Sequence, residues 1–259
     1  MNDNVHFQDK TWCEIEEAMK EGAVVILPVG STEAHGPHLP LSTDVIISVE
    51  MARRAADQLN RRGITALVLP PLAYSVTDFS RDFPGTISIR KSTAVALVRD
   101  ICLALVHQGF RTICLANSHL EPDHIDALNE AADDVARETG IRPLVPDKRR
   151  RRWAMTLTEE FRRGACHAGR YETSLVLAVE PQLVRQAVRR ELPPLEIDLA
   201  KKIREGVRTF KEAGGERAYF GDPAAATAEE GAAIYRALAD MLVISILEAL
   251  GEEGTAHQS

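Results

Sequence analysis

Side chains that can bind a metal follow the first strongly apolar segment of the chain. Glu33, His35 and Asp44 stand within fifteen residues of the end of that segment, which covers residues 23–29. Side chains alternate in extended backbone, so Glu33 and His35 point to the same face and can bind one cation or two adjacent cations. Asp44 precedes a segment of helical period, where the helix dipole also favours a carboxylate. Taken alone, Asp44 is equally well interpreted as a helix cap.

A second group of the same kind follows another apolar segment, residues 112–116. His119 and Glu121 are again two residues apart and point the same way in extended backbone. The alternative is that the carboxylates here only line the N-terminus of the next helix. His38 and His124 are interpreted as packed or hydrogen-bonded histidines and not as ligands.

A third histidine and carboxylate, His167 and Glu172, stand beside a glycine later in the chain. Together the three groups form a nitrogen and oxygen ligand set that suits Zn(II), Mn(II) or Fe(II), without a sulfur ligand. The two oxygens of Asp44 can bridge two cations about 3.5–4 Å apart, as in two-metal hydrolases. Such a pair would generate hydroxide near neutral pH and polarise a carbonyl oxygen.

Short apolar segments alternate with longer segments of helical period, and this pattern predicts a mainly parallel sheet covered by helices. The alternation predicts an α/β fold in which the strand ends bring the three polar groups to one edge of the sheet. The predicted strands are residues 23–29, 64–70, 112–116 and 142–145, and the predicted helices are residues 45–59, 92–107, 123–138 and 227–250.

The last helix is apolar nearly all round between Met241 and Leu247, so we expect it in a deep core or a subunit contact. The chain has no linker rich in proline or serine and no internal repeat, so residues 1–259 form one predicted domain. Residues 252–259 are expected to form a disordered tail.

Composition excludes several classes of protein. The 259 residues are 45% hydrophobic and 27% charged, with a formal net charge of -7, which argues against general nucleic-acid binding. The four cysteines stand far apart, so we expect reduced thiols. Neither a signal peptide nor an apolar stretch long enough to cross a bilayer is visible, which predicts a cytoplasmic protein without a membrane partner.

The polar groups also carry a family resemblance. The segment of residues 27–40, LPVGSTEAHGPHLP, together with Asp44, closely resembles the signature of the creatininase (creatinine amidohydrolase) family. The agreement continues in order along nearly the whole chain, through FPGTI at residues 83–87, through HAG and ETS at residues 167–174, and through GDP and ATAE at residues 221–229.

The resemblance implies a three-layer α/β/α fold, commonly assembled as a hexamer, with two divalent metal ions per chain. Carried over by position, Glu33, His35, Asp44 and His119 match the family's metal ligands, with Asp44 as the bridge. Glu121 matches a ligand glutamate of the creatinine-hydrolysing branch, whereas Leu120 stands where that branch has a tyrosine that contacts substrate. We therefore include Glu121 among the expected ligands.

The expected function is that of an amidohydrolase acting on a small-molecule substrate with a non-peptide C–N amide bond. We expect His167 and Glu172 to be the catalytic residues, although Glu172 is also an alternative to Glu121 in the second metal site. In the hypothesis, metal-bound hydroxide attacks the carbonyl carbon and the second metal stabilises the oxyanion. His167 matches a histidine that acts on the scissile nitrogen, to which it would donate a proton.

Three alternatives remain open at this point. In the first, the enzyme acts on a short peptide, because the resemblance implies that one site architecture in this family serves cyclic amides, formamides and peptide bonds. The run of cations from Lys148 to Arg152 would bind an anion, either in a protein without turnover or at the rim of an active site. A metal-binding scaffold without hydrolysis is the third. The sequence does not identify the substrate, the native metal or the size of the oligomer.

Overall fold

The protein is built around a small parallel sheet. The computed structural model describes residues 5–164 and 167–251, so the tail predicted at residues 252–259 lies outside the described part of the chain. The sheet has three strands in the order β2-β1-β3, with β1 spanning Val24–Val29, β2 Ala66–Val68 and β3 Thr112–Asn117. Both neighbours run parallel to β1, so β1 and β3 end together at one edge.

The fourth predicted strand, residues 142–145, does not form. Leu144 makes a single bridge to Cys114 of β3 and exchanges backbone hydrogen bonds with Ile113 and Leu115. Prolines at positions 143 and 146 flank this bridge and have no N–H to donate, which limits pairing to one residue.

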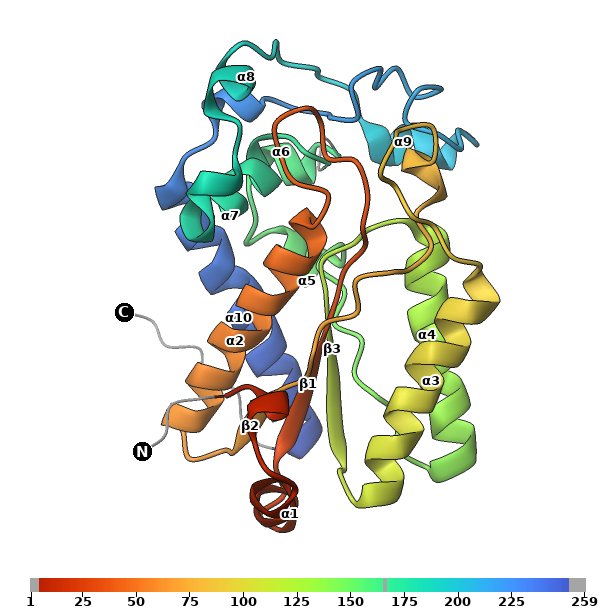
Figure 1. Ribbon diagram of the computed structural model, residues 1–259, viewed down its shortest axis with the longest axis vertical. Helices are drawn as coiled ribbons and strands as arrows, with labels where there is room; N and C mark the ends of the chain where they lie inside the picture. The colour runs from red at the N-terminus through yellow and green to blue at the C-terminus, as the bar shows by residue number, and fades with distance from the viewer. Residues whose placement is uncertain (1–4, 165–166, 252–259) are drawn as a thin grey trace.

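Helices cover both faces of the sheet, which confirms the predicted three-layer α/β/α fold (Figure 1). Side chains of β1 alternate between the two layers: Val24 and Ile26 join one buried cluster, and Val25 and Leu27 join the other. The first layer contains α2 (Thr43–Arg61), α7 (Arg170–Val179) and α10 (Ala228–Leu250), and the second contains α3 (Lys91–Gln108) and α4 (Pro122–Thr139).

The apolar segment of α10 belongs to the core of this chain. Met241, Leu242 and Val243 are buried in the cluster that α10 forms with α2 and β1. The helix begins after Thr227, whose side chain accepts a hydrogen bond from the backbone of Glu230 and so caps the helix. Of the two placements expected for this segment, a deep core or a subunit contact, the structure shows the first.

Shorter helices precede β1 and connect the other elements. They are α1 (Trp12–Lys20), α5 (Arg151–Ala154), α6 (Glu159–Arg162), α8 (Gln186–Arg190), α9 (Leu199–Arg204), η1 (Phe7–Asp9), η2 (Asp78–Ser80), η3 (Pro181–Leu183) and η4 (Pro223–Ala225). Within residues 5–164 and 167–251, every helix is too short or too polar to span a membrane.

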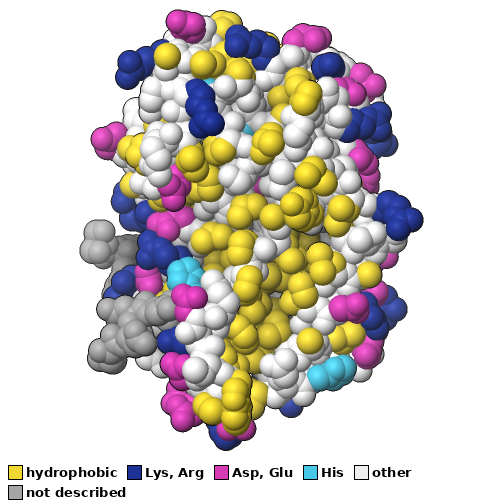
Figure 2. All heavy atoms as spheres, in the orientation of Figure 1, with side chains coloured by type: hydrophobic (Ala, Val, Ile, Leu, Met, Phe, Trp, Pro, Cys, Tyr) yellow, Lys and Arg dark blue, Asp and Glu magenta, His cyan; other side chains and the backbone are white. Residues whose placement is uncertain are grey.

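Hydrophobic side chains also gather on the surface. Figure 2 shows them along the middle of one face, between α2 and α3. Tyr74, Ile87 and Leu97 are exposed by 50%, 47% and 39%, respectively. Apolar surface of this kind is often covered in an assembly, but the expected homo-oligomer and its hexameric size stay predictions.

Candidate metal centre

The carboxyl ends of β1 and β3 deliver four of the predicted ligands to one buried point. Glu33 and His35 follow β1, His119 follows β3, and Asp44 lies in the first turn of α2. The four side chains are at most 4% exposed. Gly30 permits this arrangement, because a Cβ at that position would lie 2.7 Å from the backbone carbonyl carbon of Asp44.

The first half of the cluster consists of Glu33, Asp44 and His119. His119 Nδ1 lies 3.0 Å from Glu33 Oε1 and 3.1 Å from Asp44 Oδ2. His119 Nε2 donates to the carbonyl oxygen of Val76 over 2.8 Å, which aims Nδ1 at the two carboxylates. The three donor atoms lie close enough together to hold one cation.

The second half consists of His35, Asp44 and Glu172, the last from α7. His35 Nε2 lies 3.6 Å from Asp44 Oδ1 and 3.5 Å from Glu172 Oε2. His35 Nδ1 lies 3.2 Å from the carbonyl oxygen of Glu33, a weak contact in which only the ring nitrogen can donate. Nε2 is buried and makes no hydrogen bond to the described residues. A buried imidazole nitrogen that makes no hydrogen bond and faces two carboxylates is an available ligand atom.

Hydrogen bonds fix the carboxylates. Glu33 Oε2 accepts from the hydroxyl groups of Thr77 and Ser80, which leaves Oε1 for the cluster. Asp44 Oδ2 accepts from Ser31 Oγ over 2.6 Å. Asp44 therefore offers one oxygen to each half of the cluster, as a bridging ligand would.

The close charges shift the pKa values of these groups. Burial alone would raise the pKa of Glu33, but the charge and hydrogen bond of His119 and the charges of neighbouring histidines together outweigh it and lower that pKa to about 2. Burial likewise opposes the shift of His35, yet Asp44 and Glu172 raise the pKa of His35 to about 10. Burial raises the pKa of Glu172 to about 7, with a further contribution from Asp44. The buried carboxylates thus draw positive charge into the cluster, and a divalent cation is one source of it.

His167 lies beside the cluster. Its Nε2 donates to the carbonyl oxygen of Ala34 over 2.9 Å, and Nδ1 lies 4.0 Å from Glu33 Oε1. Burial, together with the charge of His35, lowers the pKa of His167 to about 4, so its ring is neutral at pH 7. The ring also packs against Phe210, with centroids 4.2 Å apart.

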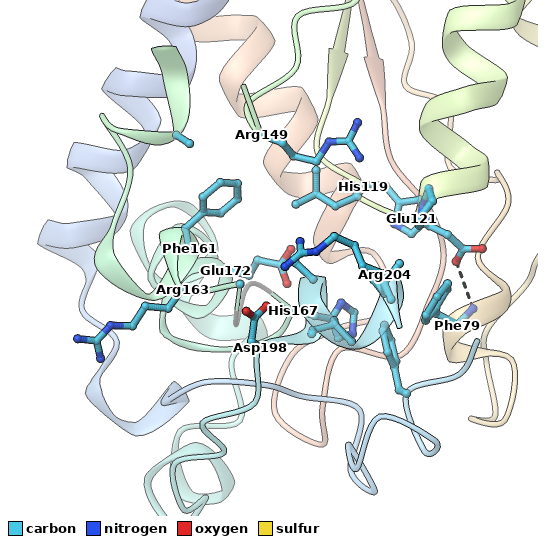
Figure 3. Close-up of a pocket in the computed structure, with 18 of the residues that line it drawn as sticks. Phe79, His119, Glu121, Arg149, Phe161, Arg163, His167, Glu172, Asp198 and Arg204 are labelled. Atoms are coloured by element: carbon cyan, nitrogen blue, oxygen red, sulfur yellow. Dashed lines mark hydrogen bonds between the residues drawn. The ribbon is translucent and has the colours of Figure 1, made fainter. Parts of the chain in front are cut away.

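Glu121 does not join the cluster. Its carboxylate oxygens accept backbone hydrogen bonds from Asp78 over 2.9 Å and from Phe79 over 3.2 Å, both in η2. Figure 3 shows the bond from Phe79. Burial raises the pKa of Glu121 above its ordinary value. The structure therefore brings Glu172, and not Glu121, to His35 and Asp44. The two histidines interpreted as packed behave as expected, since His38 bonds Thr173, and His124 bonds Ser75 and Asn117.

A pocket of about 630 Å³ opens onto the cluster (Figure 3). Glu33, Asp44, His119, His167 and Glu172 contribute to its lining. Aromatic side chains and arginines that the sequence patterns had not indicated also line it, namely Phe79, Phe161, Phe210, Arg162, Arg163 and Arg204. The aromatic side chains make part of the pocket apolar.

The cations of the run from Lys148 to Arg152 have different surroundings. Lys148 is buried and donates to the carbonyl oxygen of Ser118 over 2.9 Å. Arg152 pairs with Glu248 over 2.7 Å and is not among the residues that line the pocket. Arg149 lines the pocket, so one member of the run reaches the rim as the alternative interpretation expected.

Comparison with known proteins places these observations in a family. The family model described as creatinine amidohydrolase matches residues 8–246. The chain is 31% identical over 230 residues to the mycofactocin precursor peptide peptidase of Mycobacterium ulcerans, which covers 86% of this chain and 84% of that one. It is 30% identical over 208 residues to the creatinine amidohydrolase of Pseudomonas putida, covering 71% and 75% of the two chains.

Solved structures agree with this match. A mutant creatininase complexed with creatine has a TM-score of 0.78 at 24% identity, covering 95% of this chain and 98% of that one. A creatininase structure described as the Mn form has a TM-score of 0.74 at 25% identity, over the same shares of the two chains. The match of the family model over most of the chain, with this fold around it, shows that the protein belongs to the creatininase family.

Proposed function

We propose that the protein is a metal-dependent amidohydrolase whose buried cluster holds two divalent cations per chain. One observation carries the proposal: the two oxygens of Asp44 face two different ligand groups, and the second group contains a buried His35 nitrogen that makes no hydrogen bond to the described residues. In the proposed site Glu33, Asp44 and His119 hold one cation, and His35, Asp44 and Glu172 hold the other. Glu172 takes the place first assigned to Glu121.

The chemistry of the donor atoms fits these cations. Imidazole nitrogens and carboxylate oxygens suit Zn(II) and Mn(II), with Fe(II) as a further candidate. The structural neighbour described as an Mn form supports manganese. Bound cations of this kind activate water and polarise an amide carbonyl group.

The chain's own residues supply the remaining steps. His167 is neutral near pH 7 and has Nδ1 free, because Nε2 donates to Ala34. It accepts a proton at Nδ1 from the attacking water and delivers that proton to the departing nitrogen. The backbone N–H of Ala168 donates to Glu172 Oε2 over 2.6 Å and so fixes the carboxylate that faces His35.

Two classes of amide are candidate substrates. The similarity to the creatinine amidohydrolase supports a small non-peptide amide, for which a pocket of about 630 Å³ is spacious. The similarity to the mycobacterial peptidase supports a short peptide, and the aromatic lining of the pocket offers contacts to its side chains. The two candidates share the cluster and differ in what the outer pocket holds.

A substrate panel tests the proposal. Protein reconstituted with Zn(II), Mn(II) or Fe(II) is offered lactams, formamides and short peptides, and the released amine is measured. We expect hydrolysis of one class, and a fall of about 10²–10⁴-fold in kcat for His167→Gln, with unchanged metal content. His107→Gln, on the exposed end of α3, is the matched control. Absence of hydrolysis for all three classes, or full activity of His167→Gln, contradicts the proposal.

A further inference from the structure

Cations line the pocket away from the metal-capable cluster. Apart from the cluster, the acidic side chains in the lining are Glu121 and Asp198. Both are already engaged by backbone N–H groups: Glu121 accepts from η2, and Asp198 accepts from Lys201 over 2.8 Å. The cationic side chains in the lining are Arg149, Arg162, Arg163 and Arg204. The pocket therefore combines an acidic floor with an outer part whose lining carries four arginines and two acids.

Two of the four arginines are occupied by neighbouring acids. Arg149 makes two hydrogen bonds of 2.9 Å to the carboxylate of Asp147. Arg163 pairs with Glu159, and Figure 3 shows its side chain directed away from the pocket.

Arg162 and Arg204 are different. Across residues 5–164 and 167–251, neither guanidinium group makes an ion pair or a hydrogen bond to another side chain. In Figure 3 the side chain of Arg204 extends into the middle of the pocket. Guanidinium groups that lack an acidic partner within the fold are available to a ligand.

The fold brings these two arginines to the same pocket. Arg162 ends α6 and Arg204 ends α9. The backbone N–H of Leu199, at the start of α9, donates to the carbonyl oxygen of Gly164 over 3.2 Å, directly after α6. Leu199 is buried in a cluster with Phe79 and Phe210, which also line the pocket. The arginines thus stand on docked elements beside an apolar wall.

We propose that Arg204 and Arg162 bind an anionic group of the substrate, a carboxylate or a phosphate, at a distance from the scissile amide. The inference rests on the proposed function, because it names the substrate class of the same pocket. The planar guanidinium fork matches both anions and gives strong charge-assisted hydrogen bonds. The substrate is therefore an amide with an apolar body, which packs on Phe161 and Phe210, and an anionic end.

Binding of three matched probes tests the inference. The probes share an acetylated dialanine skeleton and end in a carboxylate, a phosphonate or a neutral carboxamide. Their binding to the metal-loaded protein is measured by calorimetry for the wild type, Arg204→Gln, Arg162→Gln and Lys202→Gln. Lys202 is an exposed cation on α9 outside the pocket lining, so its variant makes the same charge change on the same helix.

We expect at least one anionic probe to bind the wild type and Lys202→Gln about 10-fold more tightly than the carboxamide. Each arginine variant should bind that probe with about 10-fold lower affinity than the wild type. Its affinity for the carboxamide should be unchanged. The stronger of the two anionic probes identifies the anion. Equal binding of all three probes by the wild type, or an anion preference that survives in both arginine variants, overturns the inference. An anion preference that survives in both variants would indicate that the anion binds the metal ions of the cluster and not the arginines.

The test separates this inference from the proposed function. Equal cleavage of anionic and neutral amides overturns the inference and leaves the hydrolase standing. Arginine-dependent binding of an anionic probe, without cleavage of any amide in the panel, supports the inference and contradicts the hydrolase.

Discussion

Placing Glu172 in the second half of the cluster predicts that two matched substitutions have unequal effects. In Glu172→Gln a neutral amide replaces the carboxylate that lies 3.5 Å from His35 Nε2, so the half-site keeps His35 and one oxygen of Asp44. Removal of a residue that only supports a metal ligand lowers metal affinity by about 10–100-fold. Because Glu172→Gln removes a ligand itself, we expect metal affinity to fall by more than about 100-fold.

Glu121→Gln makes the same chemical change a short distance away. The carboxylate of Glu121 contacts backbone N–H groups of Asp78 and Phe79, and an amide oxygen can still accept from one of them. Glu121 makes no contact with a member of the cluster. We therefore expect Glu121→Gln to lower metal affinity by less than about 10-fold, below the usual effect of removing a residue that supports a ligand.

The assay is competition with a chelator of known affinity, followed by elemental analysis of the dialysed protein. The wild type should retain two cations per chain, Glu121→Gln two, and Glu172→Gln one. Thermal melts of the metal-free proteins control for folding. Loss of one cation from Glu121→Gln, with two retained in Glu172→Gln, would refute the assignment drawn from the geometry.

Three further predictions concern stability. In Gly30→Ala the new Cβ would lie 2.7 Å from backbone atoms of Asp44 and Val45. The free energy of unfolding, measured in urea, should therefore fall by about 1–3 kcal/mol. An unchanged value would show that α2 does not approach β1 this closely. Burial lowers the pKa of His38 in the folded protein to about 3. Below about pH 6.5 this histidine is therefore protonated in the unfolded chain but stays neutral in the folded protein. The free energy of unfolding should therefore fall as the pH falls. Between pH 7 and pH 5 the wild type should lose about 2 kcal/mol more of it than His38→Gln, whose side chain can still bond Thr173. Equal losses in the two proteins would contradict the shift in pKa. Removal of bound cations by a chelator should lower the Tm measured by calorimetry, because cations at 100 times their Kd stabilise the fold by about 2.7 kcal/mol, whereas an unaltered Tm would argue against binding.

Most of the sheet and its main helices could be predicted from local patterns. The buried segment of β1 is continuously apolar because helices cover both its faces, and α2 and α4 show the spacing of half-buried helices. The predicted strand at residues 142–145 was wrong because flanking prolines outweigh its apolar composition. The Glu-x-His spacing of Glu33 and His35 likewise predicted two neighbouring side chains, since it depends only on extended backbone.

The choice between Glu121 and Glu172 could not be made from spacing. Glu121 turns to η2, which is more than 40 residues away in the sequence, and local patterns carry no information on that approach. The arginines of the outer pocket could not be predicted from the sequence for a related reason. Arg162 and Arg204 end helices of four and six residues, which are too short to show a period, and only packing of α9 on Gly164 brings them together.

Anomalous diffraction from crystals grown with Mn(II) would locate the cations. We expect two anomalous peaks per chain that share Asp44, one beside Glu33 and His119 and the other beside His35 and Glu172. Absence of a peak from the cluster, or a single peak that does not contact Asp44, would contradict a site for two cations.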